Sequence, residues 1–240
     1  MSGTPMLWLT RPAEDSARMA QALTAHAIPT LIAPLTSITT QAITAPLAMP
    51  DALLLTSRHA CPALASLPAA WRALPTYCVG ESTAAYAQKA GFSHTMTGSG
   101  NVLALLQLLA ADLPAGAHVC YLSGEDIALD PAPLLASRRI SIERIIAYTA
   151  TAIPAIPTEL GDALASQQLQ GVVFYSARSV QIAASLLPAH ALQACDIYCL
   201  SLAIAAQAAT LGGKRLLSAA HPTHESMMEL LSTHAIKAPL

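Results

Sequence analysis

Residues 171–180 read Gly-Val-Val-Phe-Tyr-Ser-Ala-Arg-Ser-Val, a short apolar run that ends in an aromatic pair and breaks at a serine. An alanine-rich segment with helical periodicity follows. The pattern predicts a buried parallel strand, a tight turn at Ser176 and a helix whose first backbone N–H groups can bind an anion. Residues 53–60 read Leu-Leu-Leu-Thr-Ser-Arg-His-Ala and repeat this design, with Ser57 in the place of Ser176.

The repeat extends along the chain. Residues 77–91 align with residues 198–212 without a gap, and both segments begin with Tyr-Cys. The strand–helix–strand pattern of residues 7–34 likewise resembles that of residues 119–147. Alternating strands and helices joined by short turns predict parallel sheets flanked by helices, and two series of about five strands each predict two sheets.

Composition excludes several classes of protein. The chain has 240 residues, and its 12 Lys+Arg against 14 Asp+Glu give a net charge of −2. Because no basic stripe is present, nucleic acid is not an expected partner. No apolar run is long enough to span a membrane and no signal peptide begins the chain, so we expect a cytoplasmic protein without membrane contact. The five cysteines form no CxxC pair, and three in strand-like runs predict buried thiols.

Familiar catalytic and cofactor motifs are missing from the sequence. There is no GxSxG elbow, no HExxH, and neither a complete GxGxxG nor a GxxxxGK[ST] loop. His221 and His224 flank Pro222, so the two histidines cannot share one helical face as metal ligands. We therefore expect no metal site.

What remains is a set of turns rich in Ser, Thr and Gly that follow the predicted strands. Four basic residues lie beside them: Arg11, Arg58, His59 and Arg178. Ligands of open α/β sheets bind beyond the carboxyl ends of the strands. Several such turns would suit a ligand rich in carboxylates, held mainly by backbone N–H groups.

The order and spacing of six short motifs resemble the uroporphyrinogen-III synthase family over almost the whole chain. These are Leu9-Thr10-Arg11-Pro12, Thr56-Ser57-Arg58-His59-Ala60, Val79-Gly80-Glu81-Ser82-Thr83-Ala84, Tyr121-Leu122-Ser123-Gly124, Ala147-Tyr148 and Tyr175-Ser176-Ala177-Arg178-Ser179. The chain departs from the family after Ser201, where relatives often carry Pro and a polar residue and this chain has Leu202-Ala203-Ile204. Contacts from side chains of that turn are therefore less expected than contacts from its backbone.

The resemblance implies an α/β fold of two flavodoxin-like parallel-sheet domains, the second inserted into the first. Domain 1 would comprise residues 1–35 and 153–240, and domain 2 residues 39–149. A two-stranded β connector, formed by residues 36–40 and 148–151, would join the domains, with the active site in the cleft between them.

In this inserted topology, distant segments should pair within each sheet. We expect Leu7–Leu9 to lie beside Val172–Phe174 in one parallel sheet, and Leu53–Leu55 beside Cys120–Leu122 in the other.

The resemblance also implies a reaction: cyclisation of hydroxymethylbilane with inversion of the terminal ring and loss of water, without cofactor or metal. Tyr148 matches the family tyrosine proposed to assist departure of the hydroxyl. The residues expected to bind substrate are Arg11, Ser57, Arg58, His59, Gly80, Ser82, Thr83, Gly124, Ser176, Arg178 and Ser201. We expect a monomer that makes transient contact with the preceding enzyme of the pathway.

Two other classes of function stay open. One is a non-catalytic two-domain module or regulatory homologue that binds an anionic metabolite. The other is a duplicated flavodoxin-like redox protein, although its phosphate loop is missing. Turnover of hydroxymethylbilane by the purified chain separates these from the enzyme.

Overall fold

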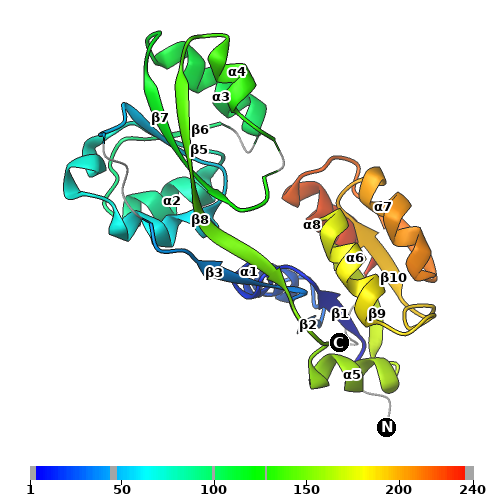
Figure 1. The fold of residues 1–240 in the computed structure, drawn as a ribbon. Helices are drawn as coiled ribbons and strands as arrows, with labels where there is room; N and C mark the ends of the chain where they lie inside the picture. The colour runs from blue at the N-terminus through cyan, green and yellow to red at the C-terminus, as the bar shows by residue number, and fades with distance from the viewer. Residues whose placement is uncertain (1–3, 44–47, 99–100, 128, 236–240) are drawn as a thin grey trace. The chain divides into compact units, whose positions relative to one another are not determined.

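The computed structural model describes residues 4–43, 48–98, 101–127 and 129–235. Contacts divide the chain into two compact units. Unit 1 comprises Met1–Ser37 and Thr151–Leu240, and unit 2 comprises Ile38–Ala150. In Figure 1 the chain up to residue 37 (dark blue) and from residue 151 on (yellow-green to red) builds unit 1, and the segment between them, from lighter blue through cyan to green, builds unit 2. The predicted mixed α/β fold with two parallel sheets is confirmed.

Unit 1 contains a five-stranded sheet with the order β11-β10-β9-β1-β2, and all its pairings are parallel. The strands are β1 (Met6–Leu9), β2 (Thr30–Ile32), β9 (Leu169–Phe174), β10 (Asp196–Cys199) and β11 (Arg215–Ser218). The expected pairing of β1 with β9 is confirmed, but its register is one residue earlier than expected, since Leu7 lies opposite Gly171 and Leu9 opposite Val173.

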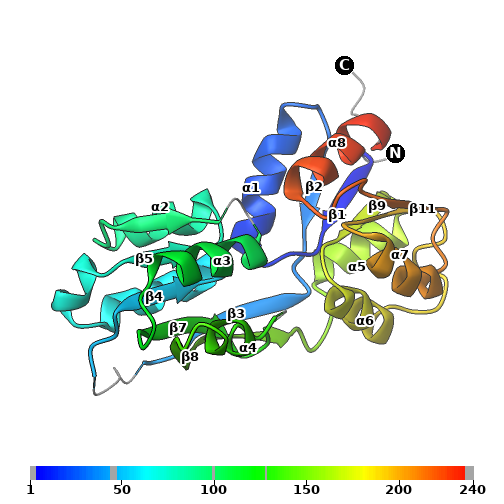
Figure 2. The ribbon, with the colours of Figure 1, turned by 90° about the horizontal axis from the view of Figure 1, so that it is seen from above.

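Helices cover both faces of this sheet (Figure 2). Leu7, Leu9 and Val173 pack against two of them, α1 (Ala13–Thr24) and α8 (His224–His234). Trp8, Val172 and Phe174 point to the other face and its helices α5 (Thr158–Ala165), α6 (Ala177–Leu186), α7 (Leu202–Ala208) and the 3₁₀ turn η3 (Ala209–Leu211). Because neighbouring residues at the end of β9 are buried on opposite faces, Val172–Phe174 form a continuous apolar run rather than an alternating one.

Unit 2 contains a six-stranded sheet with the order β3-β8-β7-β4-β5-β6. The strands are β3 (Thr36–Thr40), β4 (Ala52–Leu55), β5 (Thr76–Cys78), β6 (Thr95–Thr97), β7 (His118–Gly124) and β8 (Ser141–Ala152). The expected pairing of β4 with β7 is confirmed residue by residue, from Leu53 opposite Cys120 to Leu55 opposite Leu122. The β4, β5, β6, β7 and β8 pairings are parallel.

Strand β3 runs against β8. The Gln41 N–H donates to the Ala147 carbonyl at 2.8 Å, and the Ile153 N–H donates to the Leu35 carbonyl at 3.1 Å. As the residue number rises on one side it falls on the other, so these two segments are antiparallel.

One helix of unit 2 differs from its prediction. The helix expected after Ser57 is a 3₁₀ helix, η1 (Arg58–Ser66), with Pro62 inside it, and a second 3₁₀ helix, η2 (Ala69–Ala73), buries Trp71. Proline lacks the N–H that an α-helix needs. Both lie with α2 (Glu81–Lys89) on one face of the sheet, and the other face is covered by α3 (Val102–Asp112) and α4 (Ala132–Ala136).

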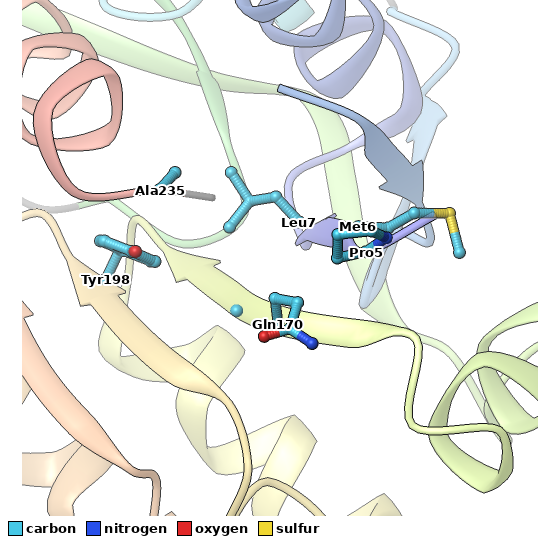
Figure 3. A pocket seen from close by; sticks show the side chains of 7 residues that line it. Pro5, Met6, Leu7, Gln170, Tyr198 and Ala235 are labelled. Carbon is cyan, nitrogen blue, oxygen red and sulfur yellow. The ribbon is translucent and has the colours of Figure 1, made fainter. Parts of the chain in front are cut away.

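The amino end of the unit 1 sheet is closed by close packing around Gly171. A pocket of about 10 Å³ lies there, between Met6 and Leu7 on one side and Gln170 and Tyr198 on the other (Figure 3). A volume of this size holds one water molecule at most. The pocket therefore marks a tightly packed edge and offers no room for a metabolite.

Replacing Gly171 by Ala should lower the free energy of unfolding by about 1–3 kcal/mol. The added Cβ would lie 2.8 Å from Cε2 of Tyr198 and 3.0 Å from the Asp196 carbonyl oxygen, which belongs to the neighbouring strand. Urea denaturation measures the change.

Gly161→Ala in α5 is the matched control. Its nearest new contact would be Ile156 Cδ1 at 4.0 Å, and Ala is favoured over Gly in a helix by about 1 kcal/mol. The control should therefore stabilise the protein. Equal free energies of unfolding for Gly171→Ala and the unmodified chain would contradict the packing described for this edge.

Candidate functional site

The residues predicted to form the site lie at the carboxyl ends of strands or in the helical turns that follow them. In unit 1, Arg11 follows β1, Ser176 and Arg178 begin α6 after β9, and Ser201 caps α7 after β10. In unit 2, Ser57, Arg58 and His59 begin η1 after β4, Gly80, Ser82 and Thr83 begin α2 after β5, Gly124 ends β7, and Tyr148 lies within β8. This is the edge at which open α/β sheets bind ligands.

Arg11 is the best-defined basic group of unit 1. Its guanidinium carbon lies 4.3 Å from the centre of the Tyr175 ring, a distance typical of a cation–π contact. The Tyr175 hydroxyl lies 2.8 Å from Nδ1 of His224 at the start of α8. Asp15, which is buried, contacts both Arg11 at 3.4 Å and Arg18 at 3.3 Å. The guanidinium of Arg11 is thus held in place at this edge, and the carboxylate of Asp15 partly neutralises its charge.

Partial removal from water shifts the pKa values in this cluster, although His224 keeps much of its surface exposed. Desolvation is the largest cause in each case: it lowers the pKa of Arg11, raises the pKa of Tyr175 to about 12 and lowers the pKa of His224. Arginine remains charged in proteins, so near neutral pH the cluster holds a cation, a phenol and a neutral imidazole. The Tyr175 hydroxyl and Nδ1 of His224 then share a hydrogen bond between two neutral groups. Sequence reasoning missed Tyr175 and His224 as partners of Arg11, because they come together only through tertiary pairing.

The lowered pKa of His224 predicts a pH dependence of stability. The unfolded chain binds the proton more readily than the folded chain, so this contribution is fully present above the ordinary pKa of 6.5 and declines as pH falls below it. Arg11 and Arg18 favour the neutral imidazole and Glu225 opposes them. When the pH falls from about 7.5 to about 5, the free energy of unfolding should therefore decrease more in the unmodified chain than in His224→Gln.

Urea denaturation of both proteins at the two pH values checks this prediction. The effect should be modest, because the His224 side chain is exposed. The prediction would be contradicted if acidification lowered the free energy of unfolding more in His224→Gln than in the unmodified chain.

Three serine hydroxyls cap the helices at these edges. Ser57 Oγ accepts from the His59 N–H at 3.2 Å, Ser176 Oγ from the Ser179 N–H at 3.1 Å, and Ser201 Oγ from the Ile204 N–H at 3.4 Å. Each hydroxyl satisfies one backbone donor of a first turn. These hydroxyls therefore stabilise the first turn of each helix at the edge of the sheet.

A pocket of about 410 Å³ lies beside Ser201, at the carboxyl ends of β10 and β11. Ser218 and Pro222 line it together with Leu202, whose side chain is 77 % exposed. A wide pocket with few charged groups can accept a ring or an aliphatic arm, with polar contacts confined to hydroxyls and backbone groups.

Gly124 and Tyr148 form the tightest contact at the edge of unit 2. The two residues lie opposite each other across β7 and β8, after a shift of register that leaves Ala147 unpaired in the ladder. A Cβ on Gly124 would lie 2.7 Å from Cζ and 2.8 Å from Oη of Tyr148. Glycine is therefore needed for the phenol to lie over the end of β7. The His59 ring lies 5.7 Å from the Tyr148 ring, with the planes at 58°.

Arg144 is a further polar residue of this edge that the sequence analysis did not select. Its Nε donates to Ser123 Oγ at 2.8 Å, and its Nη2 donates to the carbonyls of Gly124 and Glu125. A basic side chain on the same strand as Tyr148, four residues before it, was the signal that could have found it.

At the start of α2, only one of the two hydroxyl-bearing residues is exposed to solvent. Gly80 is the N-cap and supplies no side chain, and Ser82 is exposed. Thr83 is buried with 4 % exposure, next to Cys61, whose Sγ lies 3.8 Å from the Thr83 carbonyl. The structure thus brings His59, Gly124 and Tyr148 together but keeps the Thr83 side chain inside the unit.

The cysteines are buried, and burial raises the pKa of Cys61, Cys78, Cys120 and Cys199 to about 12 and that of Cys195 to about 11. Such thiols are poor nucleophiles. Across the described ranges no group of three or more His, Cys, Asp or Glu residues could hold a metal ion. Within those ranges, too, every helix is too short or too polar to cross a membrane.

Comparison with known proteins agrees with these features. The family model "Uroporphyrinogen-III synthase HemD" matches residues 17–229. The solved uroporphyrinogen-III synthetase from Helicobacter pylori is 17 % identical, with a TM-score of 0.64 over 96 % of this chain and 99 % of that chain. A mutant uroporphyrinogen III synthase from the extremely thermophilic bacterium Thermus thermophilus is 16 % identical, with a TM-score of 0.53 over 96 % of this chain and 97 % of that chain.

No curated protein matches the chain significantly. At 16 % and 17 % identity the two solved structures establish the fold. The family model covers most of the 240 residues. The chain therefore belongs to the uroporphyrinogen-III synthase family.

Proposed function

We propose that this chain catalyses the reaction of its family, the cyclisation of hydroxymethylbilane to uroporphyrinogen III in heme biosynthesis. The observation that carries the proposal is the family match over residues 17–229, on a chain whose fold is shared with solved members. The enzyme is then a cyclising lyase that releases water and inverts the terminal ring of a linear tetrapyrrole.

The chemistry requires orientation more than reactive side chains. Loss of the terminal hydroxyl gives an electrophilic azafulvene, the far pyrrole ring attacks to give a spiro intermediate, and rearrangement closes the inverted macrocycle. The substrate also closes spontaneously without inversion. Holding a flexible chain in one reactive geometry can lower a barrier by several kcal/mol, so a site without a strong nucleophile is adequate.

We assign Tyr148 as the proton donor to the departing hydroxyl. The phenol O–H supplies a proton as the C–O bond breaks, water leaves, and the proton released when the attacking ring regains aromaticity restores the phenol. The contact of Tyr148 with Gly124 and its proximity to His59 support this assignment, because they hold the phenol in one position at the carboxyl edge of its sheet.

Carboxylate arms of the substrate are bound at several helix starts at once. The residues proposed for this are Arg11, Ser57, Arg58, His59, Gly80, Ser82, Thr83, Gly124, Ser176, Arg178 and Ser201. Their position at carboxyl edges supports the assignment. Because the Thr83 side chain is buried, Thr83 acts through its backbone.

We propose a flavodoxin-like architecture for unit 1 and a different strand order for unit 2. In unit 1 the order β2-β1-β9-β10-β11 corresponds to the flavodoxin order 2-1-3-4-5. In unit 2 the five parallel strands have the order β6-β5-β4-β7-β8, or 3-2-1-4-5, so the flavodoxin-like description fits the strand order of unit 1 alone. The difference arises because β5 and β6 extend one side of β4, while β7 and β8 extend the other.

We place the domain boundaries at residues 1–35 with 153–240 and at residues 39–149. The contact division at residues 37/38 and 150/151 supports them, and β3 with β8 forms the proposed two-stranded connector. We also expect a cytoplasmic enzyme that transiently contacts the enzyme supplying its short-lived substrate.

The rate at which the purified chain consumes hydroxymethylbilane tests the function. Consumption well above the spontaneous rate, in proportion to protein concentration, is expected. Saturable binding of the substrate with consumption at the spontaneous rate would instead establish a non-catalytic binding module.

A further inference from the structure

Arg144 holds the last two residues of β7 and the residue after it, Ser123–Glu125, which we call the Ser123–Glu125 turn. It contacts three consecutive residues, through Ser123 Oγ at 2.8 Å, the Gly124 carbonyl at 2.7 Å and the Glu125 carbonyl. Ser123 is fully buried, and its hydroxyl also donates to the Gly124 carbonyl at 2.9 Å. Hydrogen bonds from a guanidinium are charge-assisted and stronger than neutral ones. The Arg144 side chain therefore stabilises the conformation of this turn beyond what the turn's own backbone hydrogen bonds provide.

The same turn supports Tyr148 in two ways. The Glu125 N–H donates to the Tyr148 carbonyl at 3.0 Å, which holds the backbone on the far side of the register shift. Gly124 lies under the phenol ring, within 2.9 Å of Cε2 if a Cβ is placed on it. Residues 123–125 therefore contact both the backbone and the ring of Tyr148.

The register shift determines which way Tyr148 faces. Ser123 pairs with Ile146 and Gly124 with Tyr148, so one residue of β8 is skipped. Ile145 and Ala147 pack on the same core as Tyr148, whereas strict alternation would turn Tyr148 to the opposite face. Such bulges re-aim a side chain, and here the bulge lies directly beside the turn that Arg144 holds.

We propose that Arg144 is a positioning residue, which holds the Ser123–Glu125 turn and through it orients the phenol of Tyr148. The inference rests on the proposed function for its kinetic consequence, but the geometric effect on Tyr148 does not depend on that function. Arginine suits the role better than lysine, because its planar fork reaches several acceptors at once.

The kinetic test compares Arg144→Gln, Arg144→Lys and the control Arg138→Gln, which alters another exposed arginine of the same unit. Arg144→Gln should lower kcat about tenfold, since small misplacements of a catalytic group are costly, and should leave KM nearly unchanged. Arg144→Lys should recover part of the loss, and it serves as the test if the glutamine variant does not fold. Arg138→Gln should behave like the unmodified enzyme.

A double-mutant cycle then asks whether the effect passes through Tyr148. In a Tyr148→Phe background, Arg144→Gln should cause no further loss of kcat. An equal loss in both backgrounds, or an unchanged kcat in the single variant, would overturn the proposal.

An NMR measurement tests the geometry even if the chain proves inactive. In protein labelled on tyrosine rings, the Tyr148 signal is assigned by its absence in Tyr148→Phe. Arg144→Gln should shift the Tyr148 signal and leave the Tyr175 signal of unit 1 unchanged, while Arg138→Gln should shift neither. A Tyr148 signal that does not move in Arg144→Gln would overturn the proposal independently of any activity.

Discussion

Tyr148→Phe should slow the formation of uroporphyrinogen III about 100-fold, the low end of what general acid catalysis contributes. The low end is expected because the hydroxyl departs readily to give the azafulvene. Only one hydroxyl is lost, and the ring still fills the space beside Gly124 and His59, so the fold should persist. Released substrate continues to close spontaneously, and the uninverted isomer should accumulate.

Chromatography of the oxidised porphyrins gives both the rate and the isomer ratio. Tyr86→Phe, in α2 of the same unit, is the matched control and should behave like the unmodified enzyme. If Tyr148 only packs against the core, Tyr148→Phe will also keep the rate and ratio of the unmodified enzyme, and Tyr148 then has no part in the mechanism.

Gly124→Ala should lower kcat by about 10- to 100-fold, because a displacement of about 1 Å can cost a factor of that size. The new Cβ would overlap the far end of the Tyr148 ring at 2.7–2.9 Å. A ring can swing away, so the protein should fold with Tyr148 displaced from its position.

Combining the two changes identifies the cause. Gly124→Ala should add little to Tyr148→Phe if it acts by displacing the phenol, and Gly161→Ala should leave kcat unchanged. Full activity of a folded Gly124→Ala variant would show that the position of the ring does not matter.

The central strands and the starts of the helices that follow them were the parts of the fold most accessible from sequence. The runs before Ser57 and Ser176 predicted two central strands, and both serines do cap the helices that follow. Thr223 likewise caps the last helix. These features are local: an apolar run and a capping hydroxyl a few residues later are enough to specify them.

The rest depends on pairing between distant segments. The bulge at residues 147–148 exists only once β8 lies against β7, and the cluster of Arg11, Tyr175 and His224 joins three elements from opposite ends of the chain. The 3₁₀ form of η1 was not predicted, although Pro62 in the sequence is a local signal against a regular α-helix. Side-chain partners such as Arg144 with Ser123 follow from the tertiary fold, which no local pattern encodes.

The isomer formed by the unmodified protein tests the central claim most directly. Freshly prepared hydroxymethylbilane is incubated with increasing amounts of the chain, and the oxidised products are separated into the inverted and uninverted isomers. The fraction of the inverted isomer should rise with protein concentration until it dominates. A product that remains the uninverted isomer at every protein concentration would contradict the account.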